Sequence, residues 1–246
     1  METLSQIKTN LKSLRLSSMY ENVERIIDDA INNKMTYADF LFQLTQDEID
    51  RRKQHRLELS LKRSNLGRFK RIQEFDFDFN ININRQKIMK LMTCDFMKTN
   101  ENIIIAGPTG VGKTFIAKAL GFEAACKGYE VLFVRTNKML EEIYSGKADG
   151  TFQKKLNHYV KPDLLILDDW GMTSYNDFML HILNEIISER YENGSLIITS
   201  NRPVEKWGEL FKEPVIGAAL LDRIFHQSYR FIFDGKSYRR GGKKDA

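Results

Sequence analysis

Long hydrophobic runs are absent from this sequence of 246 residues. The apolar runs are short pieces such as the Leu-Leu-Ile-Leu at residues 164–167, whereas a helix that crosses a membrane needs about 20 consecutive apolar residues. The first charged residues are also not followed by the apolar segment of a secretory signal. We therefore expect a cytoplasmic protein that has no membrane anchor.

Cysteine is scarce, and the sequence contains two, Cys94 and Cys126. They lie far apart without the CxxC or CxxH spacing of a zinc site, and the four histidines show no ligand pairing. Neither a disulfide framework nor a zinc site is expected, so we interpret both cysteines as core or surface thiols. The remaining composition, 42% hydrophobic and 29% charged, is that of an ordinary globular chain with a sizeable core.

Acidic residues are rare in two segments of the chain. Residues 51–71 contain nine Lys or Arg and one Glu, and residues 223–246 contain seven basic residues and two Asp. The first fifty residues instead hold five basic and nine acidic residues. A basic segment attracts a polyanion and releases its condensed counterions, so nucleic acid is the leading candidate partner. The alternative is that these charges only keep a helix surface hydrated.

The amino-terminal part of the sequence has the pattern of helices. Apolar residues recur at helical spacing over residues 4–33, which predicts two or three short helices. Another helix is predicted over residues 36–64, with Thr36 as its N-cap and Asp39 three residues later. The apolar face of this helix fades as its basic face grows. Such a helix is expected to pack at one end and to lie on phosphates at the other.

A change of pattern marks the expected domain boundary. Gly67 and the alternating sequence FDFDFNININ at residues 75–84 end the helical pattern. From residue 85 onward strands alternate with helices, which is typical of a parallel sheet whose ligand lies at the carboxyl ends of its strands. We therefore predict an α/β fold over residues 71–246, preceded by a small all-α domain of residues 1–70.

The elements expected in the second domain follow one another closely. They are a helix at 85–98, a strand at 102–106, a helix through 125, a strand at 130–135, helical segments at 137–145 and 151–159, a strand at 163–170, a helix at 177–193 and a strand at 195–201.

A glycine-rich loop follows the first of these strands. Its sequence GPTGVGKT fits the phosphate-binding pattern G-x-x-x-x-G-K-[ST], and it stands between an apolar strand and a helix as that pattern requires. Glycines let successive backbone N–H groups face one anion, and the helix amino terminus adds partial positive charge. We expect Lys113 to bridge the outer phosphates of a nucleoside triphosphate and Thr114 to ligate magnesium. The phosphate-binding residues are Gly107, Pro108, Thr109, Gly110, Val111, Gly112, Lys113 and Thr114.

Two carboxylates end a later strand, at residues 164–167. Asp168 is expected to hold Mg²⁺ through water, as the second acidic motif of P-loop NTPases does. Asp169 stands where many such ATPases carry a glutamate that polarises the attacking water. Because an aspartate is one methylene shorter, hydrolysis is expected to be slow. An acidic strand end is a weak signal alone, but its place after the glycine loop makes it strong.

A polar residue ends the following strand. The sequence SLIITSNRP places Ser200 and Asn201 there, and a neutral side chain in that position can orient the attacking water or sense the γ-phosphate. Asn201 is the better candidate. The alternative is that Asn201 only turns the chain before Arg202 and Pro203.

The order of these motifs resembles a known family. The segments GPTGVGKT, LLILDDWG, IITSNRPVEKWGELF and ALLDRIFHQSYRFIFDGKSYR follow one another as in the IstB-like transposition helper ATPases. That family is of the AAA+ class and is related to the DnaC and DnaI helicase loaders. The resemblance extends over nearly the whole chain, and the last segment is much more specific than a phosphate loop.

The resemblance implies a function. Proteins of this family are ATP hydrolases that use ATP and Mg²⁺, assemble as ATP-dependent homo-oligomers on duplex DNA, bend the DNA, and recruit a partner transposase in insertion-sequence transposition. It also suggests Arg223 as an arginine finger for a neighbouring copy and Arg239 as a sensor-2-type arginine. With these two, the expected catalytic set is Asp169, Asn201, Arg223 and Arg239.

Duplex DNA is expected to meet two basic surfaces. Residues 51–71 lack the interleaved aromatics that stack on single strands, Phe69 excepted, which favours contact with the duplex backbone. The helical segments before the acidic strand resemble the extra helix with which initiators and loaders touch DNA. The first set is Arg51, Arg52, Lys53, Arg56, Lys62 and Arg63, and the second is Lys138, Lys147, Lys154 and Lys155.

Two alternatives remain open at this point. A replicative helicase loader of the same fold would grip a helicase with its amino-terminal helices. A metabolic P-loop kinase or signalling switch would have no nucleic-acid partner, but the basic segment at 51–71 argues against it.

Overall fold

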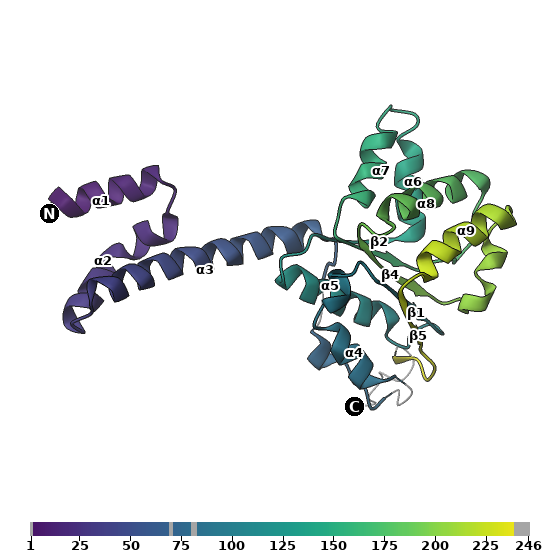
Figure 1. The fold of residues 1–246 in the computed structure, drawn as a ribbon, viewed down its shortest axis with the longest axis horizontal. Coiled ribbons are helices and arrows are strands. Elements are labelled where there is room, and N and C mark those ends of the chain that lie inside the picture. Colours follow the sequence, from purple (N-terminus) through teal and green to yellow (C-terminus); the bar gives the residue numbers. More distant parts are fainter. Residues whose placement is uncertain (1, 69–70, 80–82, 239–246) are drawn as a thin grey trace, which may run out of the picture. The chain divides into compact units, whose positions relative to one another are not determined.

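A computed structural model describes residues 2–68, 71–79 and 83–238 of the chain (Figure 1). Its residue contacts group the chain into two compact units, Met1–Leu59 and Ser60–Ala246. The boundary that the sequence suggests after residue 70 stays a prediction. Within the described residues, no helix combines the length and the apolar character that crossing a bilayer requires.

The amino-terminal unit is helical, as predicted. It contains α1 (Glu2–Ser13), α2 (Ser17–Asn32) and most of α3 (Tyr37–Arg63). The predicted N-cap of α3 is confirmed, because the Thr36 hydroxyl accepts a hydrogen bond from the Asp39 N–H at 3.2 Å. The small core of this unit is made of Leu11, Val23, Ile26 and Leu44.

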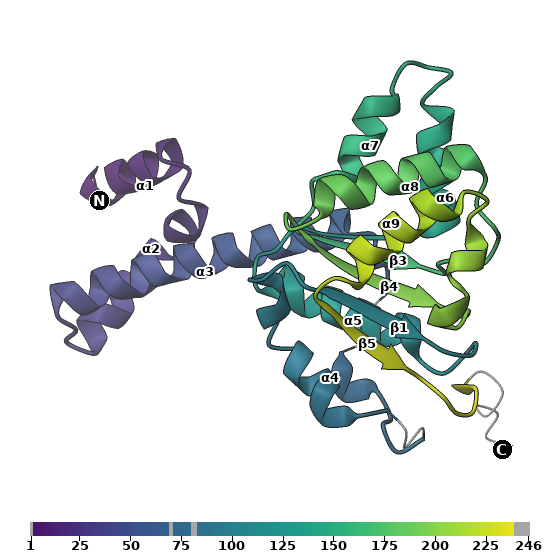
Figure 2. The ribbon, with the colours of Figure 1, turned by 45° about the vertical axis from the view of Figure 1, so that its right-hand side comes forward.

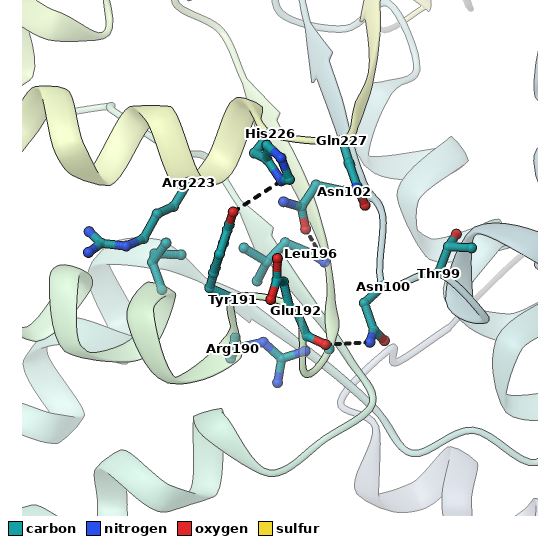
Figure 3. A pocket seen from close by; sticks show the side chains of 12 residues that line it. Thr99, Asn100, Asn102, Arg190, Tyr191, Glu192, Leu196, Arg223, His226 and Gln227 are labelled. Carbon is teal, nitrogen blue, oxygen red and sulfur yellow. Dashed lines mark hydrogen bonds between the residues drawn. The ribbon is translucent and has the colours of Figure 1, made fainter.

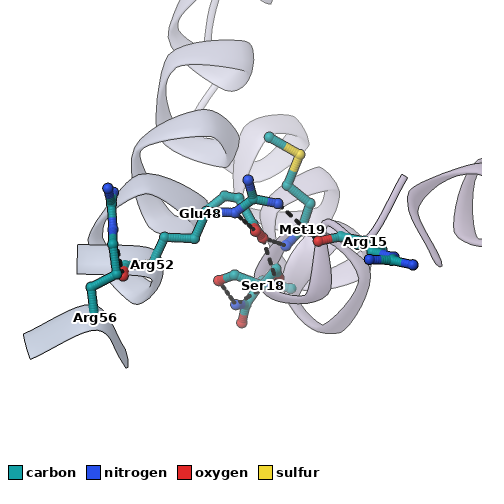
Figure 4. Close-up of polar contacts among 7 residues, drawn as sticks. Arg15, Ser18, Met19, Glu48, Arg52 and Arg56 are labelled. Atoms are coloured by element: carbon teal, nitrogen blue, oxygen red, sulfur yellow. Dashed lines mark hydrogen bonds and ion pairs between the residues drawn. The ribbon is translucent and has the colours of Figure 1, made fainter. Parts of the chain in front are cut away.

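A buried carboxylate joins α2 to α3 (Figure 4). Leu16 at the N-cap of α2 has no side chain to bind the free amides of the first turn. Instead Glu48 of α3 accepts hydrogen bonds from the N–H groups of Ser18 at 2.8 Å and Met19 at 3.3 Å, and from Arg52 Nε at 2.7 Å. Burial raises the pKa of Glu48, but the hydrogen bonds from Arg52 and the two amides outweigh burial and hold that pKa below its ordinary value.

The second unit is built on a parallel five-stranded sheet in the order β2-β3-β4-β1-β5. The four strands predicted from the sequence are confirmed. The apolar runs of the strands at 102–106, 164–168 and 195–200 are buried on both faces, as in parallel sheets covered by helices. The strands are β1 (Asn102–Ala106), β2 (Val131–Arg135), β3 (Leu164–Asp168), β4 (Ser195–Ser200) and β5 (Ser228–Ile232).

Helices cover both faces of the sheet (Figure 2). α5 and α4 lie on one face, and α6 to α9 lie on the other, where they share one apolar core with the strands. The described helices of this unit are α4 (Arg85–Leu91), α5 (Lys113–Cys126), α6 (Thr136–Ser145), α7 (Phe152–Val160), α8 (Asp177–Arg190) and α9 (Pro214–Phe225). Short 3-10 helices are η1 (Ile72–Glu74), η2 (Asp95–Met97), η3 (Val204–Lys206) and η4 (Gly208–Leu210).

Several local details differ from the sequence prediction. The helix predicted at 85–98 ends at Leu91, and η2 follows separately, because Cys94 adopts a left-handed conformation with φ of 55°. After the strand at 195–201 the sequence predicted no further element, whereas the structure has α9 and then β5, which pairs with β1 from Asn102 to Ala106. The carboxyl edge of this sheet positions the candidate site.

Candidate nucleotide-binding site

The candidate site lies where β1, β3 and β4 end. The glycine loop connects β1 to α5, so Lys113 stands in the first turn of that helix. Lys113 Nζ donates hydrogen bonds to the carbonyls of Gly107 at 2.8 Å and Pro108 at 2.7 Å, and to Asn201 Oδ1 at 2.6 Å. The structure therefore brings together a lysine and an asparagine that lie 88 residues apart in the sequence.

The backbone of the loop needs glycine for two reasons. Gly112 has a φ of 101°, in the left-handed region that disfavours side chains. A Cβ atom at this position would also lie 2.5 Å from the Phe75 ring. A phosphate-binding loop in this conformation therefore depends on close packing against a segment that precedes the sheet.

Two oxygen ligands face each other beside the loop. The Thr114 hydroxyl donates to Asp168 Oδ1 at 2.8 Å, and the Thr199 hydroxyl donates to the same oxygen at 2.5 Å. Asp168 is buried at the end of β3. A hydroxyl and a carboxylate are the hard oxygen donors that Mg²⁺ prefers, usually together with waters and substrate phosphates. The donor set at Thr114 and Asp168 therefore fits magnesium.

Asp169 is held in a conformation that is unusual for its type. Its φ is 58°, and its backbone N–H donates to the Thr199 hydroxyl at 3.3 Å. Left-handed residues other than glycine are uncommon and concentrate at functional sites. This turn lets the chain leave β3 with the Asp169 carboxylate on the rim of the same cavity as Lys113.

Sequence analysis missed an arginine beside this carboxylate. Arg135 ends β2 in register with Asp168, and its Nε lies 3.8 Å from Asp169 Oδ2. Its side chain is 73% exposed. The signal that could have found it is positional, because Arg135 ends a strand of the same parallel sheet as the two aspartates.

A cavity of about 800 Å³ contains these groups, within the range of about 300–1,000 Å³ that is typical of small-molecule sites. Lys113, Thr114 and the two aspartates line it together with Asn201. The aromatic residues that line it were also missed by the sequence analysis, namely Phe75, Phe79, Phe115 and Tyr238.

Arg223 does not reach this cavity in the same chain. It projects from α9 toward Asn184 of α8, with 3.4 Å between Arg223 Nη1 and Asn184 Oδ1. It lines a separate pocket together with Asn102 and Gln227 (Figure 3). These two residues lie at the amino ends of β1 and β5. The pocket is therefore at the amino ends of the parallel strands, whereas the glycine loop is at their carboxyl ends. Arg239 lies outside the described residues.

A buried arginine stabilises the same pocket region. Arg190 is 2% exposed, and burial lowers the pKa of its guanidinium to about 10. Its hydrogen bonds connect the carboxyl-terminal end of α7 to the start of β4. This role was not predicted from the sequence. Its guanidinium donates to the carbonyls of Tyr159, Val160, Pro162, Asp163 and Ser195.

The basic residues predicted for DNA differ in their surroundings. In α3, Arg51 pairs with Glu21 at 2.7 Å, and Arg52 donates both to Glu48 and to the Arg15 carbonyl. Lys53 lies 4.0 Å from Asp50. Further along the helix the predicted side chains are exposed, and these are Arg56, Lys62 and Arg63.

The second predicted basic set lies on α6, on α7 and between them. Lys147 Nζ lies over the Phe178 ring at 3.6 Å from its centroid, a cation–π contact. Lys155 donates to the Ser145 hydroxyl at 2.9 Å and lies 3.4 Å from Asp149 Oδ2. Lys138 and Lys154 are exposed.

Comparisons with known proteins agree with this architecture. A family model described as the IstB-like ATP binding protein matches residues 9–246. The chain is 33% identical over 231 residues to the ATP-binding protein of insertion sequence IS5376 from Geobacillus stearothermophilus, covering 94% of this chain and 92% of the relative. It is 34% identical over 234 residues to that of IS232 from Bacillus thuringiensis subsp. berliner, covering 95% and 94%.

Solved structures share the fold. The DnaC helicase loader superposes with a TM-score of 0.56 at 23% identity, covering 70% of this chain and 97% of that one. DnaI superposes with a TM-score of 0.58 at 23% identity, covering 67% and 90%. These matches confirm the predicted α/β fold, a parallel sheet flanked by helices.

Proposed function

The chain belongs to the IstB-like ATP binding proteins, and from that membership we propose that it is an AAA+ ATPase that assists a partner transposase in insertion-sequence transposition. In this proposal it binds ATP with Mg²⁺, assembles on duplex DNA in the cytoplasm, and hydrolyses ATP slowly. The observation that carries the proposal is the meeting of Lys113, Thr114, Asp168 and Asn201 at one edge of the sheet.

Binding of the triphosphate begins with an exchange of partners at Lys113. Its ammonium group leaves the loop carbonyls and Asn201 Oδ1 and binds the outer phosphates, which offer stronger, charged acceptors. Thr114 and Asp168 hold Mg²⁺, which neutralises charge on the phosphates when it is bound. Asn201 is then free to face the γ-phosphate.

Hydrolysis needs a base near the attacking water, and Asp169 takes that role in our proposal. The water oxygen bonds to the γ-phosphorus, its proton passes to the Asp169 carboxylate, and the bond between the γ-phosphorus and the bridging oxygen breaks to leave ADP and phosphate. Asn201 orients the water by a hydrogen bond.

The position of Arg223 supports an assembly of several copies. It lies at the amino ends of the parallel strands, away from the cavity of its own chain, and we propose that it completes the site of a neighbouring chain. An arginine supplied by a neighbour stabilises the charge that develops on the γ-phosphate, which makes hydrolysis depend on assembly. Arg239 is proposed to add a second positive charge.

The basic residues of α3 and of the α6–α7 region are proposed to contact the DNA backbone. The relatives that match nearly the whole chain come from insertion sequences. They favour transposition over helicase loading, since the likeness to DnaC and DnaI at 23% identity concerns the fold alone.

Purified protein tests the proposal directly. We expect Mg²⁺-dependent ATP binding, duplex binding that is stronger with ATP than without nucleotide, and stimulation of a partner transposase. Electron microscopy with DNA and ATP should show ordered oligomers. Tight binding to a replicative helicase, with no effect on the transposase, would replace the proposal by the loader alternative.

A further inference from the structure

Residues 233–238, here called the strap, run along the glycine loop after β5. The Phe233 N–H donates to the Ala106 carbonyl at 2.7 Å, and the Tyr238 N–H donates to the Gly110 carbonyl at 2.9 Å. The strap is thus hydrogen-bonded to the last residue of β1 and to the glycine loop. It belongs to the wall of the nucleotide cavity, which Tyr238 lines.

Gly110 also receives the strap. It occupies a variable position of the G-x-x-x-x-G-K-[ST] pattern, which does not require glycine there. Its φ is 88°, and a Cβ atom on it would collide with the Ser237 hydroxyl. The loop of this chain therefore has the shape that receives the strap.

Several contacts fix the Tyr238 ring in place. Its hydroxyl donates to the Asp76 carbonyl, which ties the strap to the segment before the sheet. The ring stacks on Phe79 with centroids 4.1 Å apart and planes at 28°, and it lies 5.7 Å from the Phe75 ring. Three aromatic side chains thus form one continuous wall of the cavity, which we call the aromatic wall: Phe75, Phe79 and Tyr238.

Strand order determines which part of a nucleotide meets this wall. β1 and its loop lie between β4 on one side and β5 on the other. Asn201 follows β4 and Asp169 follows β3, so the groups for the γ-phosphate are on one side of the loop. The strap follows β5, on the other side. A triphosphate whose outer end faces Asp169 directs its nucleoside toward the aromatic wall.

We infer that the aromatic wall is the nucleobase subsite and that Tyr238 is a nucleotide-binding residue that selects purines. A purine offers a larger stacking surface than a pyrimidine does. Glu74 and Asp76 flank Phe75 in the sequence and line the same cavity, and each carboxylate accepts backbone N–H groups through one of its two oxygens. Their oxygens accept a hydrogen bond from the exocyclic amino group of adenine and repel the carbonyl oxygen that guanine carries there. This inference rests on the proposed ATP site.

Competition against radiolabelled ATP, with Mg²⁺, tests the subsite through four competitors. For the wild type we expect the affinity order ATP, GTP, CTP, with inorganic tripolyphosphate weakest. Tyr238→Ala should weaken ATP binding by about 5- to 100-fold, the range expected for losing one base–aromatic stack. Its affinity for tripolyphosphate should stay within about twofold, because the phosphate groups keep their partners.

Two further variants complete the comparison. Tyr238→Phe keeps the ring and loses the bond to the Asp76 carbonyl, so it should retain the preference for ATP over CTP. Tyr37→Ala removes a tyrosine that is 92% exposed in the amino-terminal unit and should behave as wild type.

The outcomes separate this inference from the proposed function. If Tyr238→Ala lowers ATP and tripolyphosphate affinity equally, the strap only supports the loop, and the subsite is refuted while ATP binding stands. An unchanged ATP affinity, or a wild type that does not distinguish ATP from CTP, refutes it as well. A wild type that binds no triphosphate overturns both.

Discussion

At the scale of single residues, Lys113 and Asp169 separate binding from chemistry. Lys113→Ala should abolish measurable ATP binding, because the charge that faces the outer phosphates is removed. Asp169→Ala should bind ATP normally and lower turnover by about 100-fold or more, the usual size of the effect of removing a general base. Equilibrium binding and phosphate release measure the two effects.

The matched control at this site is Asp169→Glu, which keeps the carboxylate and extends its reach by one methylene. It should hydrolyse ATP at least as fast as the wild type. Normal turnover in Asp169→Ala would show that the base is elsewhere, with Asp168 or Asn201 to be tested next.

Arg135 gives a second prediction at this scale. Its guanidinium draws the Asp169 carboxylate toward the end of β2, with 3.8 Å between the atoms. We expect Arg135→Ala to raise the basal rate of hydrolysis, but by no more than about fivefold, because an exposed ion pair contributes only about 0–1 kcal/mol. Arg135→Lys keeps the charge and should stay near the wild-type rate. A basal rate that falls in Arg135→Ala would mean that the arginine contacts the phosphates instead.

At the scale of elements, Glu48 couples α2 to α3 and makes the amino-terminal unit sensitive to acid. The pKa of Glu48 is lowered in the folded chain, so its contribution to stability is complete above the ordinary glutamate pKa of about 4.3 and is lost as pH falls through the lower folded value. The unit should therefore loosen in acid before its core is disturbed.

Glu48→Gln tests this contribution at neutral pH. The amide can still accept hydrogen bonds from the first turn of α2 but loses the charged pair with Arg52, so we expect a loss of roughly 1–3 kcal/mol. Hydrogen exchange of α2 in the full chain measures it. Glu21→Gln, which removes only the exposed partner of Arg51, is the control and should change exchange little. If the amides of α2 are equally protected from hydrogen exchange in both variants, the assigned role of Glu48 is contradicted.

The predicted binding of α3 to DNA is also a property of the element. The prediction concerns the exposed basic residues at its end, because Arg52 supports the fold through Glu48 and its removal would confuse two effects. Replacing Arg56, Lys62 and Arg63 by alanine should flatten the slope of log affinity against log salt by up to about 2.7 units, at about 0.9 unit for each phosphate that the variant no longer neutralises.

Three exposed lysines of the second unit provide the control for this measurement: Lys87, Lys90 and Lys98. Their triple alanine variant removes the same charge and should leave the slope of duplex binding unchanged. A slope that changes equally in both variants would indicate a general charge effect rather than binding by α3.

At the scale of the whole molecule, Arg223 predicts complementation between inactive copies. A chain with Lys113→Ala should not bind ATP but still presents Arg223, whereas a chain with Arg223→Ala should bind ATP but lacks the proposed arginine finger. Each should be inactive alone, and a mixture should recover part of the DNA-stimulated hydrolysis. If the mixture stays inactive while both variants assemble, the finger is another residue, and Arg230 is the next to test.

The sequence predicted those parts of the site that are short and local. The glycine loop is one continuous segment, and Asp168 and Asn201 end apolar strands whose parallel order brings them to one edge. The interactions that were missed join distant residues: the Tyr238 hydroxyl meets the Asp76 carbonyl 162 residues away, and Glu48 caps a helix 30 residues before it. No local pattern indicates such pairings.

The missed strand β5 and the missed helix break after α4 each have a physical reason. β5 lies at the edge of the sheet with most of its residues partly or fully exposed, so it lacks the apolar run that identified the other strands. The break after α4 depends on the left-handed conformation of Cys94. No glycine, the residue that usually marks such a conformation, stands at this position.

The place of β5 and the strap in the chain has a consequence for biosynthesis. The ribosome makes the glycine loop near the middle of the chain and the strand and strap that brace it only after residue 227. A nascent chain that already carries Lys113 and both aspartates therefore still lacks β5, which pairs with β1, and the strap, which packs against Gly110. The ATPase unit reaches its finished form only after β5 and the strap have been made, so ribosome-bound chains ending before residue 228 should not retain ATP as chains that include them do.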